Sequence, residues 1–149
     1  MNNVFKIIVL TSTLLLASCS EKEIVLYRDS EPVQDSDVSI KIDSIFERDI
    51  FSSYSQDIYI TFVSSNPKPV ALKFKDWKIY REKDDAEYSA GCITLAFGGE
   101  LKLECEVEKK VYFSASLPSS IKEEKYKLVT HFDSKTLVCH LYDYLEQSN

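Results

Sequence analysis

Val38-Ser39-Ile40-Lys41-Ile42 alternates apolar and polar side chains at every step, and this pattern decides the fold class. Successive residues of a β-strand point to opposite faces, so the alternation predicts a strand with one buried and one solvated face. The pattern recurs at 58–62, 70–74, 101–107 and 111–117. Antiparallel sheets commonly keep one face in water, whereas parallel sheets are usually covered on both. The sequence therefore predicts an all-β protein made of antiparallel sheet.

Turn-forming residues separate these stretches at intervals of roughly 8 to 12 residues, the spacing of a β-sandwich. They lie at 64–69, 98–99, 108–110 and 133–135. Between Phe74 and Trp77 the apolar positions change parity, which indicates a β-bulge or a strand that crosses between sheets. We therefore expect Trp77 to lie near the core.

Two short segments have the spacing of a helix capping box, Ser44 with Glu47 and Ser120 with Glu123. The stretch 117–128 also resembles the loop of immunoglobulin-like domains in which a tyrosine bonds back to the backbone, with Tyr126 in that role. We therefore expect an antiparallel immunoglobulin-like β-sandwich of about seven to eight strands with one or two short helical turns.

The N-terminus has the pattern of a bacterial export signal. Ten uncharged residues, 7–16, follow Lys6, and Leu16-Ala17-Ser18-Cys19 resembles the lipobox of bacterial lipoproteins. The uncharged run is too short for a transmembrane helix, which needs roughly 18 or more apolar residues. The resemblance implies cleavage after residue 18 and lipid on Cys19, so that the membrane partner is reached through this lipid. The same resemblance implies an outer-membrane location facing the periplasm, because lipoproteins retained at the inner membrane often carry Asp where this chain has Ser20.

Cleavage would divide the chain into a signal peptide (1–18), a lipidated N-terminus with an acidic tether (19–37) and one sandwich domain (38–149). The tether is polar except for Ile24–Tyr27, which fits either an edge strand docked on the domain or a partner-binding segment. The net charge of −6 argues against binding to nucleic acid or to anionic headgroups, because both favour clusters of Lys and Arg.

Three cysteines remain once Cys19 carries lipid, and an exported protein lies in an oxidising compartment where a disulfide is expected. A two-residue turn at Gly98-Gly99 would place Cys92 directly opposite Cys105, close enough for a disulfide. An inter-sheet bond between Cys105 and Cys139 is the alternative. We expect the first pairing, with Cys139 as a buried apolar residue.

The last two strands are expected to form a hairpin in which Phe132 pairs with Leu137. This register sends His131, His140 and Tyr142 to the outer face, with the two histidines ~7 to 8 Å apart as diagonal neighbours. A metal would require further ligands that no spacing supplies, so we expect no metal site. The outer face is interpreted as either an ordinary solvated face or an interaction surface.

The sequence contains no glycine-rich phosphate loop, nucleophile elbow or zinc-protease motif, and only 3 glycines. We therefore expect no enzymatic activity and no cofactor. The favoured interpretation is a protein-binding or assembly module, such as a subunit of a secretion or conjugation apparatus. The alternatives are an immunity, exclusion or inhibitor lipoprotein that blocks a toxin, phage or hydrolase, and a hydrolase with an unrecognised site. The oligomeric state stays open. The candidate contact residues are Tyr54, Asn66, His131, His140, Tyr142 and Tyr144.

Overall fold

The structure is a computed structural model that describes residues 21–94 and 99–148. These residues form ten strands and one short 3-10 helix, η1 (Tyr144–Ser148). The strands are β1 (Lys22–Arg28), β2 (Val33–Asp35), β3 (Val38–Ile50), β4 (Ser53–Ser64), β5 (Val70–Arg81), β6 (Ala86–Cys92), β7 (Glu100–Leu103), β8 (Lys109–Leu117), β9 (Tyr126–Phe132) and β10 (Lys135–Asp143).

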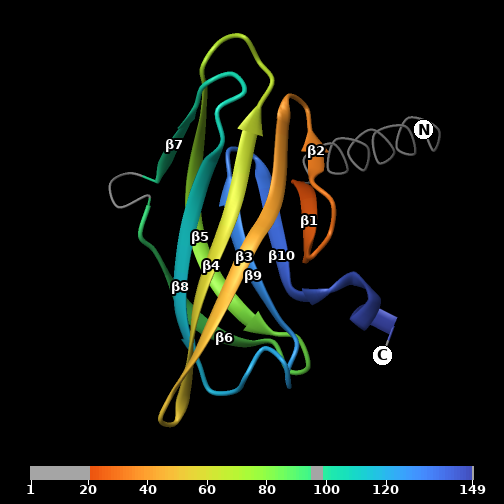
Figure 1. Ribbon diagram of the computed structural model, residues 1–149, viewed down its shortest axis with the longest axis vertical. Coiled ribbons are helices and arrows are strands. Elements are labelled where there is room, and N and C mark those ends of the chain that lie inside the picture. The colour runs from red at the N-terminus through yellow and green to blue at the C-terminus, as the bar shows by residue number, and fades with distance from the viewer. Residues whose placement is uncertain (1–20, 95–98, 149) are drawn as a thin grey trace, which may run out of the picture.

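The strands form two layers, joined by a strand that belongs to both (Figure 1). The hydrogen-bonded order is β1-β10-β9-β5-β6-β8-β4-β3-β2, and β7 pairs with the first part of β5. β6 pairs with β5 over residues 86–89 and then with β8 over residues 90–92. The all-β class and sandwich architecture are therefore confirmed, but the chain has ten strands rather than seven to eight.

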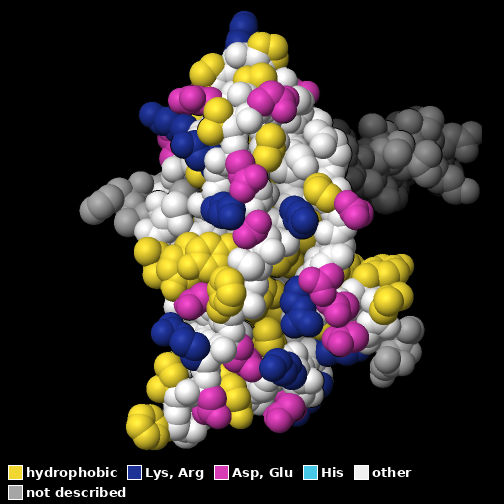
Figure 2. All heavy atoms as spheres, viewed as in Figure 1, with side chains coloured by type: hydrophobic (Ala, Val, Ile, Leu, Met, Phe, Trp, Pro, Cys, Tyr) yellow, Lys and Arg dark blue, Asp and Glu magenta, His cyan; other side chains and the backbone are white. Residues whose placement is uncertain are grey.

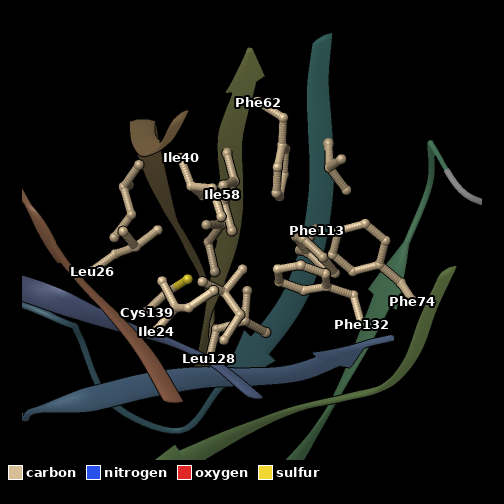
Figure 3. Close-up of a cluster of buried hydrophobic side chains, with 14 of the residues drawn as sticks. Ile24, Leu26, Ile40, Ile58, Phe62, Phe74, Phe113, Leu128, Phe132 and Cys139 are labelled. Atoms are coloured by element: carbon tan, nitrogen blue, oxygen red, sulfur yellow. The ribbon is translucent and has the colours of Figure 1, made fainter. Parts of the chain in front are cut away.

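The core lies between the layers and is built from the apolar positions of the alternating segments. Figure 3 shows these side chains converging from both sheets, including Ile40, Ile58 and Phe62 from one layer and Leu128 and Phe132 from the other. Each of these five is at most 1% exposed. The alternation that predicted the strands therefore also selects the core.

A bulge in β5 accounts for the change in parity between Phe74 and Trp77. The pairing of β5 with β9 shifts between Lys75 and Lys78, and the hydroxyl of Thr130 donates to the carbonyl oxygen of Lys75 at 3.3 Å. Trp77 packs against Phe113 with ring centroids 6.1 Å apart, and it is partly buried against the core. Of the two alternatives that the sequence left open at this point, the structure shows the bulge.

Residues 22–35 belong to the sandwich, so the domain begins before residue 38, and the edge strand is the interpretation of Ile24–Tyr27 that the structure supports. β1 pairs in parallel with β10, whereas the other strand pairs within the two sheets are antiparallel. Ile24 and Leu26 are only 3% and 1% exposed. Burial of each stabilises the docked strand by about 1.5–3 kcal/mol, which explains why this short apolar segment docks.

Asp35 joins the two strands at the free edges of the sheets. Its carboxylate accepts hydrogen bonds from Lys22 Nζ at the start of β1 and from Lys135 Nζ at the start of β10, each at 2.6 Å. Asp35 is only 3% exposed, while Lys22 and Lys135 retain 62% and 28% side-chain exposure. Burial raises the pKa of Asp35, but the hydrogen bonds from the two lysines outweigh this effect and hold the pKa below its ordinary value.

Neither expected capping box forms a helix. Ser44 and Glu47 lie within β3, where the pairing with β4 shifts between Ile42 and Ser44. The carboxylate of Glu47 instead accepts hydrogen bonds from Ser120 Oγ at 2.6 Å and from the Ile121 backbone N–H at 2.9 Å. Glu47 therefore satisfies donors of the turn between β8 and β9, and Ser120 begins that turn rather than a helix.

Tyr126 is buried, but its hydroxyl bonds to the side chain of Ser119 rather than to backbone. The prediction that the Tyr126 hydroxyl bonds to the backbone is therefore wrong.

The C-terminal hairpin pairs two residues away from the expected register. Phe132 lies opposite Lys135, around a two-residue turn at 133–134, and Leu137 lies opposite Thr130. Asp133 adopts a φ of 53° in this turn, a conformation that Asp tolerates better than most residues. A shift of two residues preserves which side chains face the core, but it separates His131 from His140, so they are not diagonal neighbours.

We predict that Asp35→Asn lowers the free energy of unfolding by about 2 kcal/mol, because it removes a buried partner from two cations. This loss of stability is smaller than that expected for a fully buried ion pair, because both lysines retain contact with water. The contribution of the carboxylate is present above its unfolded pKa and is lost as the pH falls through the lowered folded pKa. Urea unfolding at pH 7 and pH 3 measures both effects.

Lys22→Ala is the matched control, and its expected cost is under about 1 kcal/mol because Lys22 is largely exposed. Equal stability of Asp35→Asn and the native chain at pH 7 would contradict the role given to Asp35.

Candidate protein-contact site

The structure separates the six predicted contact residues into several places. Tyr54 lies at the start of β4, and Asn66 lies in the loop after β4, where its side chain donates to Asp37 at 3.3 Å. His131 contacts Glu21 at 3.2 Å. Only His140, Tyr142 and Tyr144 come together, at the end of β10 and the start of η1.

An aromatic cluster forms where these three residues meet Tyr27 of β1. Tyr27 stacks on His140 with ring centroids 4.6 Å apart, and its edge contacts to Tyr142 and Tyr144 are 6.0 and 5.2 Å. Such aromatic pairs each contribute about 0.5–1.5 kcal/mol beyond the area they bury. Tyr27 was not among the predicted contact residues, because its place beside β10 depends on the parallel pairing of β1.

Glu82 binds the polar atoms of the cluster. Its carboxylate lies 2.6 Å from Nδ1 of His140 and accepts a hydrogen bond from the Tyr142 hydroxyl at 2.7 Å. Burial lowers the pKa of His140, and the opposing attraction of Glu82 does not restore it to its ordinary value. Burial and the same carboxylate also raise the pKa of Tyr142. His140 is therefore held mainly neutral at pH 7.

Most of the cluster is occupied by contacts within this chain. The side chain of His140 is 14% exposed and Tyr142 is 4% exposed, whereas Tyr144 is 62% exposed. The cluster therefore fastens β1 and the C-terminus to the sheet, and Tyr144 is the member that offers a large surface to another molecule.

A second exposed surface lies on the hairpin between β3 and β4. Its members, Phe46, Ile50 and Phe51, are 58%, 45% and 103% exposed, and we call them the hairpin patch. Figure 2 shows hydrophobic side chains over the lower half of this face and at the lower tip of the molecule. Exposed apolar groups that gather in one place mark contact sites more strongly than scattered ones.

The hairpin patch continues into aromatic side chains on the neighbouring strands. Phe46 meets Tyr59 edge to face at 6.1 Å, and Tyr59 stacks on Tyr112 of β8 at 4.7 Å with an interplanar angle of 9°. The hydroxyl of Tyr112 donates to Asp57 at 2.6 Å. The sequence analysis missed this surface because it assigned residues after Ser44 to a helical turn. The alternation of Phe46, Arg48 and Ile50 was the available signal.

The strand pairing needed for the predicted Cys92–Cys105 disulfide is wrong. Cys92 lies opposite Phe113 of β8, and Cys105 lies beside Ser64 after β7. β6 and β7 do not form the expected hairpin with each other, because each pairs with a different part of β5. Cys139 is fully buried as expected, and burial raises the pKa of its thiol.

The described residues include no group of three or more His, Cys, Asp or Glu side chains arranged to hold a metal ion. One surface hollow of about 250 Å³ lies between the β8–β9 turn and η1, and it is lined by residues 121–125, Tyr142 and Glu146. Another of about 300 Å³ is lined by Tyr80, Asp85, Lys127 and Val129. Neither lining pairs a serine or cysteine nucleophile with a histidine.

The leader and Cys19 lie outside the described residues, so the lipidation site stays a prediction. Within the described part of the chain, no helix has the length and apolar character needed to cross a bilayer.

No protein-family model matches the sequence, and no relative is found among curated proteins. Among solved structures, the chain is similar to an uncharacterized β-sandwich protein from Clostridium difficile 630. That match has 15% identity and a TM-score of 0.47, and it covers 81% of this chain and 94% of the other.

The chain is also similar to YcdA of Bacillus subtilis, which is described as a candidate lipoprotein. This match has 10% identity and a TM-score of 0.50, covering 80% of this chain and 42% of that protein. At this level of identity the similarity supports the β-sandwich fold and says nothing about activity.

We predict that Glu82→Gln lowers the pKa of His140 further, because it removes the negative charge that opposes the effect of burial. A histidine whose folded pKa is lowered takes up a proton more readily when unfolded, so native stability falls as the pH drops through about 6.5. NMR titration of the imidazole signals measures the change.

Glu21→Gln is the control, because Glu21 contacts the other histidine, His131. A rise in the pKa of His140 in Glu82→Gln would contradict this assignment.

Proposed function

We propose that this protein is a lipid-anchored bacterial envelope protein that binds another protein, and that it is not an enzyme. It is fixed through Cys19 to the outer membrane, faces the periplasm, and acts as a binding or assembly subunit of an envelope complex. The single observation that carries the binding role is the hairpin patch, whose three apolar side chains are exposed to solvent.

The anchoring part of the proposal is supported by the lipobox-like sequence and by the position of β1. β1 begins at Lys22, so only Ser20 and Glu21 separate it from Cys19. Three residue steps span at most about 11 Å, which would keep the start of β1 close to the headgroups. Stable anchoring by this route requires two or three acyl chains, since one chain binds only reversibly.

The binding part is supported by the surface chemistry. Interfaces place aromatic and apolar anchors at their centre, and these residues contribute most of the binding energy. Phe46, Ile50 and Phe51 supply such anchors, and Tyr59 and Tyr112 extend them across the sheet. The linings of the two hollows described above contain no serine or cysteine that could act as a nucleophile.

An inhibitor or immunity lipoprotein that blocks a basic toxin, phage component or hydrolase is the second candidate. Acidic side chains near the hairpin favour it, because Asp49, Glu123 and Glu47 raise the pKa of Tyr54. The two candidates differ in the origin of the partner: a complex subunit binds the cell's own proteins, whereas an inhibitor binds a foreign one.

The anchor is tested by replacing Cys19 with serine in cells fed radiolabelled palmitate. We expect the native chain to incorporate label and to fractionate with the outer membrane, and Cys19→Ser to lose both properties. Serine keeps a similar size but lacks the thiol that accepts the lipid. Cys105→Ser is the matched control, because the thiol of Cys105 is exposed and unbridged, and this variant should label normally. Equal labelling of Cys19→Ser and the native chain would refute the anchor.

A further inference from the structure

The turn at the tip of the β3–β4 hairpin places a bulky residue in a backbone conformation that such residues rarely adopt. Ile50 pairs with Ser53, which leaves Phe51 and Ser52 as a two-residue turn. Phe51 has a φ of 56°, in the left-handed region. Two-residue hairpin turns favour Asn, Asp or Gly at such positions, because a bulky side chain there costs free energy.

The other described residues with positive φ follow this preference more closely. They are aspartates at four positions, with Ser36, Glu106 and Gly99 at the rest. Phe51 is the one apolar side chain in the set, and it is also 103% exposed. It therefore gains nothing from burial that would offset the strain. Residues kept in strained conformations are found preferentially at functional sites.

The hairpin tip also lies far from the place where the chain leaves toward Cys19. Lys22 bonds to Asp35, and Asp35 pairs with Val38 at the start of β3. The tip lies at the other end of β3, 13 residues long, which corresponds to about 40 Å of strand. Figure 1 shows this hairpin projecting beyond the rest of the sandwich, on the side away from β2.

The charges beside the tip are mainly negative. Arg48 is paired with Asp57 at 3.4 Å, and Asp49 lies opposite Tyr54 in the strand pairing beside the tip. The negative charge of Asp49 has the largest effect in raising the pKa of Tyr54. An acidic surround disfavours contact with anionic headgroups and favours a protein surface that carries Lys or Arg.

From these observations we propose that Phe51 is the anchor residue of the interface, inserted into an apolar socket of a partner protein whose rim carries Lys or Arg side chains. The proposal rests on the protein-binding function and specifies its site. Ile50 and Phe46 pack beside the inserted ring, and Asp49 faces the basic rim. The strained turn keeps the phenyl ring of Phe51 in solvent, so the ring is buried only when the partner binds.

Photocrosslinking in the intact envelope tests the site. p-Benzoylphenylalanine is placed at position 51, and, as controls, at Tyr144 and at Val107, an exposed apolar residue near the start of β3. We expect one discrete protein adduct at position 51 and none at 107. The cross-linked peptide of the partner should contain apolar residues flanked by Lys or Arg. Adducts to lipid or to a second copy of this chain at position 51 would overturn the proposal.

The identified partner is then purified and titrated against variants of the full-length lipidated chain. Phe51→Asn should weaken binding by about 30-fold or more, as loss of a central anchor does, whereas Phe51→Trp should retain it. Asp49→Asn should reduce the association rate and its dependence on salt. Unchanged affinity in Phe51→Asn would overturn the proposal.

Phe51→Asn also separates loss of binding from loss of fold. Asn tolerates the left-handed conformation, so this variant should melt about 2–4 °C higher than the native chain. A lower melting temperature would show that Phe51 serves the fold and would overturn the proposal. Adducts at position 144 but not at 51 would refute this site while leaving the binding function intact, and no protein adduct at any of the three positions would refute both.

Discussion

The closure of the sandwich depends on one buried carboxylate. β1 and β2 stand at the two ends of the strand order, so no backbone hydrogen bonds join these edges. Asp35 supplies the missing connection by binding Lys22 and Lys135 from the opposite layer. A buried carboxylate is costly to desolvate, and its hydrogen bonds to these cations offset that cost. The same contact fixes where the chain leaves the domain toward its N-terminus.

The sequence predicted the features that depend on local pattern. Period-two alternation identified the strands and their buried faces, and the parity change near Trp77 located the bulge in β5. It could not predict features that depend on distant partners. Glu47 has the spacing of a helix cap, yet it binds a turn more than 70 residues away, and that partner is invisible to a local motif. The hairpin pairing expected between the strands of Cys92 and Cys105 was wrong for the same reason, since β6 pairs with β5 and then with β8.

The candidate contact surface was predicted in part. His140, Tyr142 and Tyr144 were among the predicted contact residues and do come together, but their contacts with Tyr27 required the parallel pairing of β1. The register of the last hairpin was two residues off, because the turn is shorter than expected and Asp133 accommodates it. The hairpin patch was missed because a capping-box pattern at Ser44 was preferred over the alternation that follows it.

The pairing of β1 with β10 has a consequence for the order in which the protein can fold. Arg28 and Asp143 meet across a separation of 115 residues, so the first strand of the domain finds its neighbour only when the last strand is present. Contacts this far apart in sequence slow folding, because a long loop must close before they form. Ile24 and Leu26 lack β10 as a packing partner until the last strand has been synthesised. A product truncated before β10 keeps these apolar side chains accessible to other chains, which favours aggregation.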